Sequence, residues 1–257
     1  MKIVAALFAA LFASLASATT VTTDFTDNWW VPGESGWGAN VVQQGDTLFV
    51  TVFVYGLDGT ATWYVAPSTA YQGLVGGSQQ FSGPLYRTTG PYFGGTFDAS
   101  GVAATPVGTL RFFTPQTADA ELVYDVNGVT VTKSVTRQTW RVDNISGAYA
   151  GATVGGFDGA CFNRGGFVSP ATYIARQVGT QVTIDETGPH YACRYTGTLS
   201  QTGRLGTIMG TAQCSDTGTG TFTASEVQAG LDFLSMRLNS QAGTCSFVGR
   251  MGGMRTR

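Results

Sequence analysis

Apolar and polar side chains alternate along most of the chain, and this period of two constrains the fold more than any other feature. Runs such as TLFVTVFVYG and TQVTIDET alternate in this way, and short turns rich in Gly, Asn and Asp separate them. Such alternation is typical of strands with one buried face, and Asn127-Gly128 is the strongest hairpin signal in the chain. The pattern predicts an all-β protein, in which only residues 224–234 suggest a helical turn.

The chain divides into two halves of different chemistry. All five tryptophans lie before residue 145, whereas all four cysteines and the only histidine lie after it. The segments ANVVQQGDTLFVT and YIARQVGTQVTID repeat one order of strand, Gln, turn Gly and strand. We expect domains at 19–145 and 146–257, each a small antiparallel up-and-down β-barrel, because about seven or eight strands per half suffice to close one. A pair of β-sandwiches is the alternative.

The first 18 residues have the pattern of a secretory signal peptide, with Lys2, an apolar run and Ala16-Ser17-Ala18 before the expected cleavage point. We therefore expect a secreted or periplasmic protein with no transmembrane segment in the mature chain. Charged residues make up 12% of the chain and the net charge is −2. With no run of Lys or Arg, this composition argues against a nucleic-acid partner.

The four cysteines predict disulfides, because the chain is expected to be exported and contains no Cys-x-x-Cys. Three connectivities are possible. The hairpin spacing favours Cys193–Cys214, and closure of a barrel favours Cys161–Cys245. We expect no metal and no cofactor, and we interpret the lone His190 as an exposed loop residue.

The stretch WWVPGESGWG gathers three of the tryptophans around one carboxylate, Glu34. We expect Trp37 to close one barrel end, with Trp29, Trp30 and Pro32 packed outside it. In Trp63-Tyr64 one side chain faces the lumen, since neighbours on a strand point to opposite faces. The candidate ligand-binding residues are Trp37, Trp63, Tyr55, Tyr64 and Glu34. No catalytic residue is predicted, because Ser35 lies in no nucleophile elbow and this half has no histidine.

Residues 29–64 resemble a set of bacterial secreted proteins that share a WW-x-P-x-E-S-G-W-G … Q-G-D … W-Y segment. The resemblance implies an exported protein of proteobacterial type and carries over no activity, ligand or catalytic residue. The strand rhythm is also similar to that of the calycins, the lipocalin- and avidin-like barrels, which is an analogy of fold alone.

We expect an exported, non-catalytic binding protein that holds a small apolar or glycan ligand in an aromatic-lined barrel or contacts a protein surface. One alternative is a secreted hydrolase that uses carboxylates such as Glu34 and Asp58, which would have to face one cleft. The other alternative is a structural or surface-adhesive module.

Overall fold

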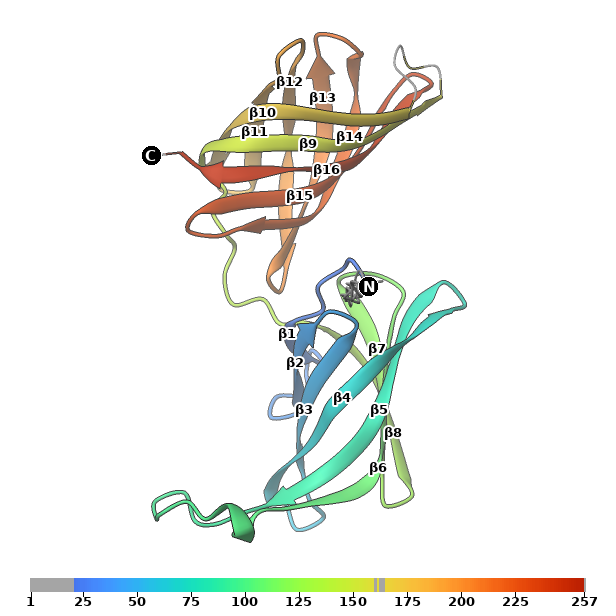
Figure 1. Cartoon of the computed structure of the whole chain (residues 1–257), viewed down its shortest axis with the longest axis vertical. Helices are drawn as coiled ribbons and strands as arrows, with labels where there is room; N and C mark the ends of the chain where they lie inside the picture. Colours follow the sequence, from blue (N-terminus) through green and yellow to red (C-terminus); the bar gives the residue numbers. More distant parts are fainter. Residues whose placement is uncertain (1–20, 160, 162–164, 257) are drawn as a thin grey trace, which may run out of the picture.

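The computed structural model describes residues 21–159, 161 and 165–256, so the expected signal peptide at 1–18 lies outside the described residues. Figure 1 shows two closed β-barrels in tandem, joined by residues 138–146. In each barrel eight antiparallel strands follow one another in chain order, and the last pairs with the first. The predicted fold class is confirmed. The expected division at 145/146 falls within the linker, although Ile145 already packs into the core of the second barrel.

The strands of the first barrel are β1 (Asp27–Trp30), β2 (Gly38–Gln44), β3 (Thr47–Tyr55), β4 (Ala61–Val75), β5 (Ser78–Thr89), β6 (Ala103–Thr114), β7 (Asp119–Val126) and β8 (Val129–Arg137). A short 3₁₀ turn, η1 (Ala99–Gly101), precedes β6. The strands of the second barrel are β9 (Gly147–Gly159), β10 (Gly165–Val178), β11 (Gln181–Thr187), β12 (Ala192–Thr202), β13 (Leu205–Cys214), β14 (Gly218–Ala229), β15 (Phe233–Ala242) and β16 (Cys245–Arg255).

Aromatic rings fill the first barrel at the end that faces the second. Trp29 of β1 is 1% exposed, and its ring meets Phe112 edge-on with centroids 5.1 Å apart. Phe25, from the segment before β1, covers this end and packs against Phe81. The expectation that Trp29 packs outside the barrel is wrong, because the alternation of β1 turns Trp29 inward and leaves Trp30 half-buried on the other face.

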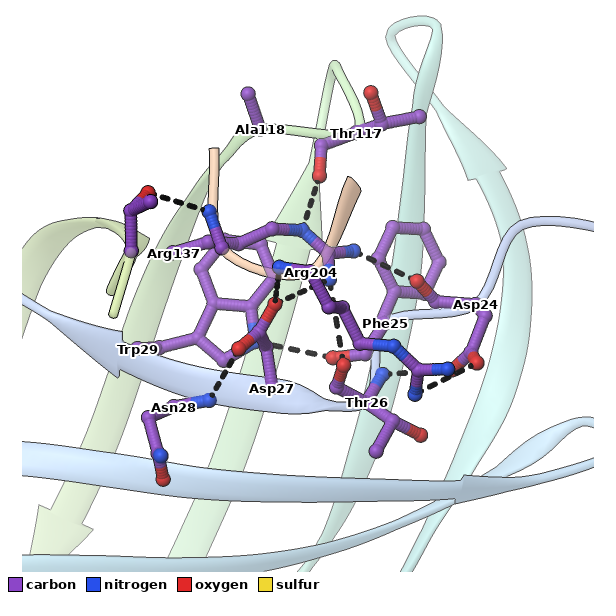
Figure 2. A network of polar contacts seen from close by, with 12 residues as sticks. Asp24, Phe25, Thr26, Asp27, Asn28, Trp29, Thr117, Ala118, Arg137 and Arg204 are labelled. Carbon is purple, nitrogen blue, oxygen red and sulfur yellow. Dashed lines mark hydrogen bonds and ion pairs between the residues drawn. The ribbon is translucent and has the colours of Figure 1, made fainter. Parts of the chain in front are cut away.

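Arg137, the last residue of β8, closes this end of the barrel. Figure 2 shows its buried guanidinium against the Trp29 ring, with the guanidinium carbon 4.7 Å from the ring centroid. Its Nη1 lies 3.1 Å from Asp27 Oδ2, and its Nε and Nη2 donate to the carbonyls of Thr117 and Asp24. The buried charge is therefore paired with a carboxylate, hydrogen-bonded and stacked on an aromatic face, as a buried ion requires.

The second barrel repeats this arrangement at the end that faces the first. Arg255 of β16 lies over the Tyr149 ring of β9, 4.9 Å from its centroid, and donates to the Tyr149 hydroxyl and to the Ser146 carbonyl. Ile145 is buried four residues before Tyr149, just as Phe25 is buried four residues before Trp29. One building plan therefore underlies the two sequence halves.

Direct contacts join the two barrels. Arg204, in the β12–β13 turn, donates its backbone N–H to Asp27 Oδ2 over 2.9 Å, and its guanidinium lies 3.2 Å from Asp24 (Figure 2). Thr23 donates its hydroxyl to the buried Glu226 of β14 over 3.0 Å. The segment before β1 thus contacts both barrels.

The structure contains the disulfides Cys161–Cys245 and Cys193–Cys214, so the favoured connectivity is confirmed. The suggested helical turn at 224–234 is wrong. These residues continue β14 through a bulge, where Glu226 takes a φ of 51°, and lead into β15. In the part of the chain described, no helix has the length and apolarity needed to cross a membrane.

Replacement of Arg137 by Met should strongly destabilise the first barrel. The change would leave the Asp27 carboxylate and several carbonyls partly unpaired in a buried place, which typically costs about 3–5 kcal/mol. Because every tryptophan precedes residue 145, tryptophan fluorescence in urea follows the first barrel separately from the second.

Arg141→Met is the matched control, since that side chain is 80% exposed and its ion pair with Asp143 is superficial. The control should change the free energy of unfolding by less than about 0.5 kcal/mol. Equal effects of the two substitutions would contradict the role given to Arg137.

Candidate functional site

Trp37 and Tyr64 lie at the end of the first barrel that faces away from the second. Trp37 is half-buried against the core, and its Nε1 donates to the Tyr124 hydroxyl over 3.0 Å. The two rings stack with centroids 6.5 Å apart. Burial raises the pKa of Tyr124, while the hydrogen bond from Trp37 opposes the rise. Trp37 therefore helps to close this barrel end, and Tyr64 packs beside the same core.

The other candidate residues of the first half lie outside the lumen. Trp63 is 51% exposed, because Tyr64 takes the inward position of the Trp63-Tyr64 pair. Tyr55, at the end of β3, is 58% exposed. Glu34 forms an exposed ion pair with Lys133 at 2.5 Å. Asp58 accepts from the backbone N–H of Thr60 within its own turn. Glu34 and Asp58 thus take part in separate local interactions.

Exposed aromatic residues line the outer face of the first barrel. Phe53 of β3 pairs in register with Trp63 of β4 on one side and with Gly38 of β2 on the other. Trp30 of β1 is next to Gly38 of β2, because the two strands are antiparallel and their neighbours Trp29 and Ala39 are partners. We call Trp30, Phe53 and Trp63 the aromatic strip. A groove runs beside it, and Trp140 of the linker forms part of its lining.

The second barrel contains a cavity at the end remote from the first barrel. The turn at Arg204 touches the first barrel, whereas the β13–β14 and β15–β16 turns and both disulfides lie at the opposite end (Figure 1). One wall of the cavity consists of aromatic rings and the other of the Cys193–Cys214 disulfide and the following turn. Its lining residues include Phe157, Phe167, Tyr191, Phe247, Asp216 and Ser240.

Two glycines shape this wall. Gly155 of β9 and Gly249 of β16 are partners across the barrel seam. A Cβ on either would lie within 2.7 Å of the Phe247 ring. The absence of side chains at these positions lets the ring lie flat along the seam, where it contacts Phe157 with centroids 4.9 Å apart.

A buried carboxylate, Glu186 at the end of β11, lies at the floor of the cavity and is 1% exposed. Its Oε1 accepts hydrogen bonds from Thr153 Oγ1 at 2.5 Å and from the Tyr191 hydroxyl at 2.6 Å. Its Oε2 accepts from the Tyr195 hydroxyl at 3.0 Å. Because Thr153 donates to Glu186, the Tyr173 hydroxyl, 2.9 Å away, donates to Thr153. Three strands and one loop thus direct hydroxyl hydrogens toward one carboxylate, or toward the Thr153 hydroxyl that donates to it.

The tyrosines of this network are held in the neutral form. Burial raises the pKa of Tyr173 to about 12, and the Glu186 charge adds to the rise. Burial also raises the pKa of Tyr191 and Tyr195, and each donates to Glu186 in a bond that an ionised phenol could not make. The network therefore favours phenolic donors around a carboxylate acceptor.

Sequence reasoning did not identify this site, although one signal was present. In VTIDET the alternation places Val182, Ile184 and Glu186 on the same inward face. A glutamate in an inward position is unusual and marks a candidate site. Its hydroxyl partners come from β9, β12 and the loop before β12, and no local pattern connects those residues.

The described residues offer one potential metal-ligating group, formed by Cys193, Cys214 and Asp216. Both cysteines are joined in a disulfide, so their sulfurs are not available as thiolate ligands. His190 is exposed in its loop, as expected.

The tyrosine network predicts a late alkaline titration. The pKa of Tyr173 is higher in the folded chain than its ordinary value of 10.0. The protonated Tyr173 therefore stabilises the folded state fully below pH 10. This stabilisation is lost as the pH rises from about 10 toward 12. A titration of phenolate absorbance should show the tyrosines of this network as a second group that ionises well above pH 10 or only with unfolding.

Glu186→Gln should shift the second group to lower pH, because the carboxylate charge and acceptor contribute to the raised pKa of Tyr191 and Tyr195. Glu121→Gln, at an exposed position of the first barrel, should leave the titration unchanged. Ionisation of every tyrosine in a single step near pH 10, without unfolding, would contradict the network.

No protein-family model, curated protein sequence or solved structure gives a significant match to this chain. The functional assignment therefore depends on the geometry of the chain's own residues.

Proposed function

We propose that this protein is an exported, non-catalytic binding protein that holds a small molecule in the cavity of its second barrel. The observation that carries the proposal is the buried Glu186, hydrogen-bonded by three hydroxyls at the floor of an aromatic-walled cavity. Ligand sites in proteins are typically concave and mostly apolar, with a few convergent polar groups that orient the ligand. The second barrel has this composition within its lumen.

The surroundings of the cavity support binding in preference to catalysis. The described residues that line it include no histidine or lysine, and its two cysteines form a disulfide. The cavity end is fixed by Cys161–Cys245 as well as by Cys193–Cys214, which favours a pre-formed site. Two disulfides also suit an oxidising compartment, either secreted or periplasmic.

Ser240→Phe should abolish ligand binding by filling the cavity. Ser240 lies in register between the inward-facing Phe222 and Phe247 and lines the cavity. Ligand-observed NMR with a mixed library of small polar, apolar and charged fragments should give hits for the unmodified protein that are lost in this variant. Native mass spectra of protein from an oxidising periplasm would reveal any ligand that stays bound.

Val248→Phe is the matched control, since Val248 lies next to Phe247 but is 61% exposed on the outer face. It should retain every hit. Hits that survive in Ser240→Phe, or an absence of hits in the unmodified protein, would contradict the proposal.

The aromatic strip supports a second candidate function, the binding of a glycan chain on the outside of the first barrel. Trp30 and Phe53 lie two strands apart, about 10 Å, and Gly38, which has no side chain, lies between them. Asn28, Ser35 and Gln138 line the adjacent groove and offer hydrogen bonds to hydroxyls. Flat rings beside polar amides suit the alternating apolar and hydroxyl faces of a sugar chain.

Phe53→Ala should weaken binding of soluble β-1,4-linked hexasaccharides of glucose or N-acetylglucosamine by roughly two- to tenfold, the usual range for one aromatic contact. Affinity electrophoresis or titration calorimetry would measure the change. Phe97→Ala is the control, because Phe97 is also exposed but lies in the β5–β6 connection. Equal losses in the two variants, or no binding of either hexasaccharide, would exclude the strip as a glycan site.

A further inference from the structure

The buried charged side chains described in this protein have two kinds of partner, either opposite charges or neutral hydroxyls. Arg137 is paired with Asp27, and Glu226 lies 2.8 Å from the guanidinium groups of both Arg237 and Arg250. Glu186 is more deeply buried than Glu226, yet among the described residues it contacts only neutral hydroxyls. A buried ion is normally compensated by an opposite charge. That Glu186 has no charged partner among the described residues is the observation from which the inference starts.

The hydrogen bonds of Glu186 leave room for one more donor. An ionised carboxylate offers about four lone-pair positions on its two oxygens. Oε1 accepts two hydroxyls and Oε2 accepts one, so a position on Oε2 is left. Glu186 also lines the cavity, so its side chain borders the space in which a ligand would lie.

The wall beside the carboxylate suits a positive charge. Phe157, Phe167 and Phe247 form a continuous group, with ring centroids 4.9 to 6.0 Å apart, and Tyr191 extends it toward Glu186. The faces of aromatic rings carry partial negative charge and attract cations, including quaternary ammonium groups. Asp216 at the rim has the same sign as Glu186 and would repel an anion.

We propose that the ligand of the second-barrel cavity is a small organic ammonium ion, whose charged head contacts Glu186 and the aromatic wall while its substituent points toward the open end. This inference rests on the proposed function and specifies the ligand class. The carboxylate would supply the charge partner, and the phenylalanines would supply an apolar surface for the methyl or methylene groups. Neutral and anionic molecules of the same shape would bind less well.

The first test uses the unmodified protein and two molecules of nearly identical shape. Choline carries a trimethylammonium head, and 3,3-dimethyl-1-butanol carries an uncharged tert-butyl group in its place. Titration calorimetry or ligand-observed NMR should show that choline binds at least about tenfold more tightly. Ethanolamine, with a smaller head that donates N–H bonds, tests whether the free position on Oε2 is used. Tighter binding of ethanolamine than of choline would still support an ammonium ligand.

Glu186→Gln keeps the shape of the side chain and removes its charge, so it should reduce choline binding by at least about tenfold and leave 3,3-dimethyl-1-butanol unaffected. Glu121→Gln changes the net charge equally at an exposed position on the first barrel and should bind choline as the unmodified protein does. Circular dichroism would verify that both variants fold.

The outcomes separate this inference from the proposed function. Equal binding of choline and its neutral analogue would overturn the ammonium assignment and leave a cavity for neutral ligands. If neither ammonium ion bound, but other fragments bound to the unmodified protein and not to Ser240→Phe, the ammonium assignment would also be overturned. The proposed binding function would be retained. Failure of every fragment would overturn both.

Discussion

The contact between a final-strand arginine and a first-strand aromatic ring is the interaction on which each barrel depends. A closed sheet has no free edge, but its closure requires the most distant strands in sequence to pair. In the first barrel this seam is short, with Trp29 opposite Arg137 and Trp30 opposite Thr136. Arg137 adds to these few backbone bonds a stacked guanidinium, an ion pair with Asp27 and hydrogen bonds to two other segments. Arg255 and Tyr149 occupy the same places in the second barrel.

The weak repeat between the sequence halves has its physical basis at the same barrel ends. The Trp29 indole donates to the Phe25 carbonyl, and the Tyr149 hydroxyl donates to the Ile145 carbonyl, each four residues back. Gln43 accepts from the Phe25 N–H and Gln177 from the Ile145 N–H, so each glutamine holds the residue that covers the end of its barrel. Each glutamine also donates to the carbonyl of a glycine two residues on. The glutamine and turn glycine therefore recur because they position the covering segment.

Features of the fold that depend on local pattern could be predicted from the sequence, whereas those that depend on cross-strand register could not. Alternation and turn residues predicted the strands, and the hairpin that joins Cys193 to Cys214 predicted that disulfide. Alternation also requires one of Trp63 and Tyr64 to face inward, but it does not say which, because a shift of one residue reverses every side chain. The environment of Glu186 depends on residues from separate strands, so the sequence contained its inward position but not its hydroxyl partners.

The two barrels use the same closure but differ in what fills them, and this difference is the basis for the separate site that we propose on each. The first barrel is covered at one end by Phe25 and closed at the other by Trp37 and Tyr124, and the aromatic strip lies on its outer face. The second barrel is covered by Ile145 at the end that faces the first. Toward its other end the lumen holds Glu186, hydroxyls and the ring of Phe247, which two glycines accommodate. A filled barrel can bind ligands only on its surface, whereas a barrel with a cavity above a polar floor can bind a small molecule within. The tandem therefore places the proposed outer site and the proposed inner site on one structural plan.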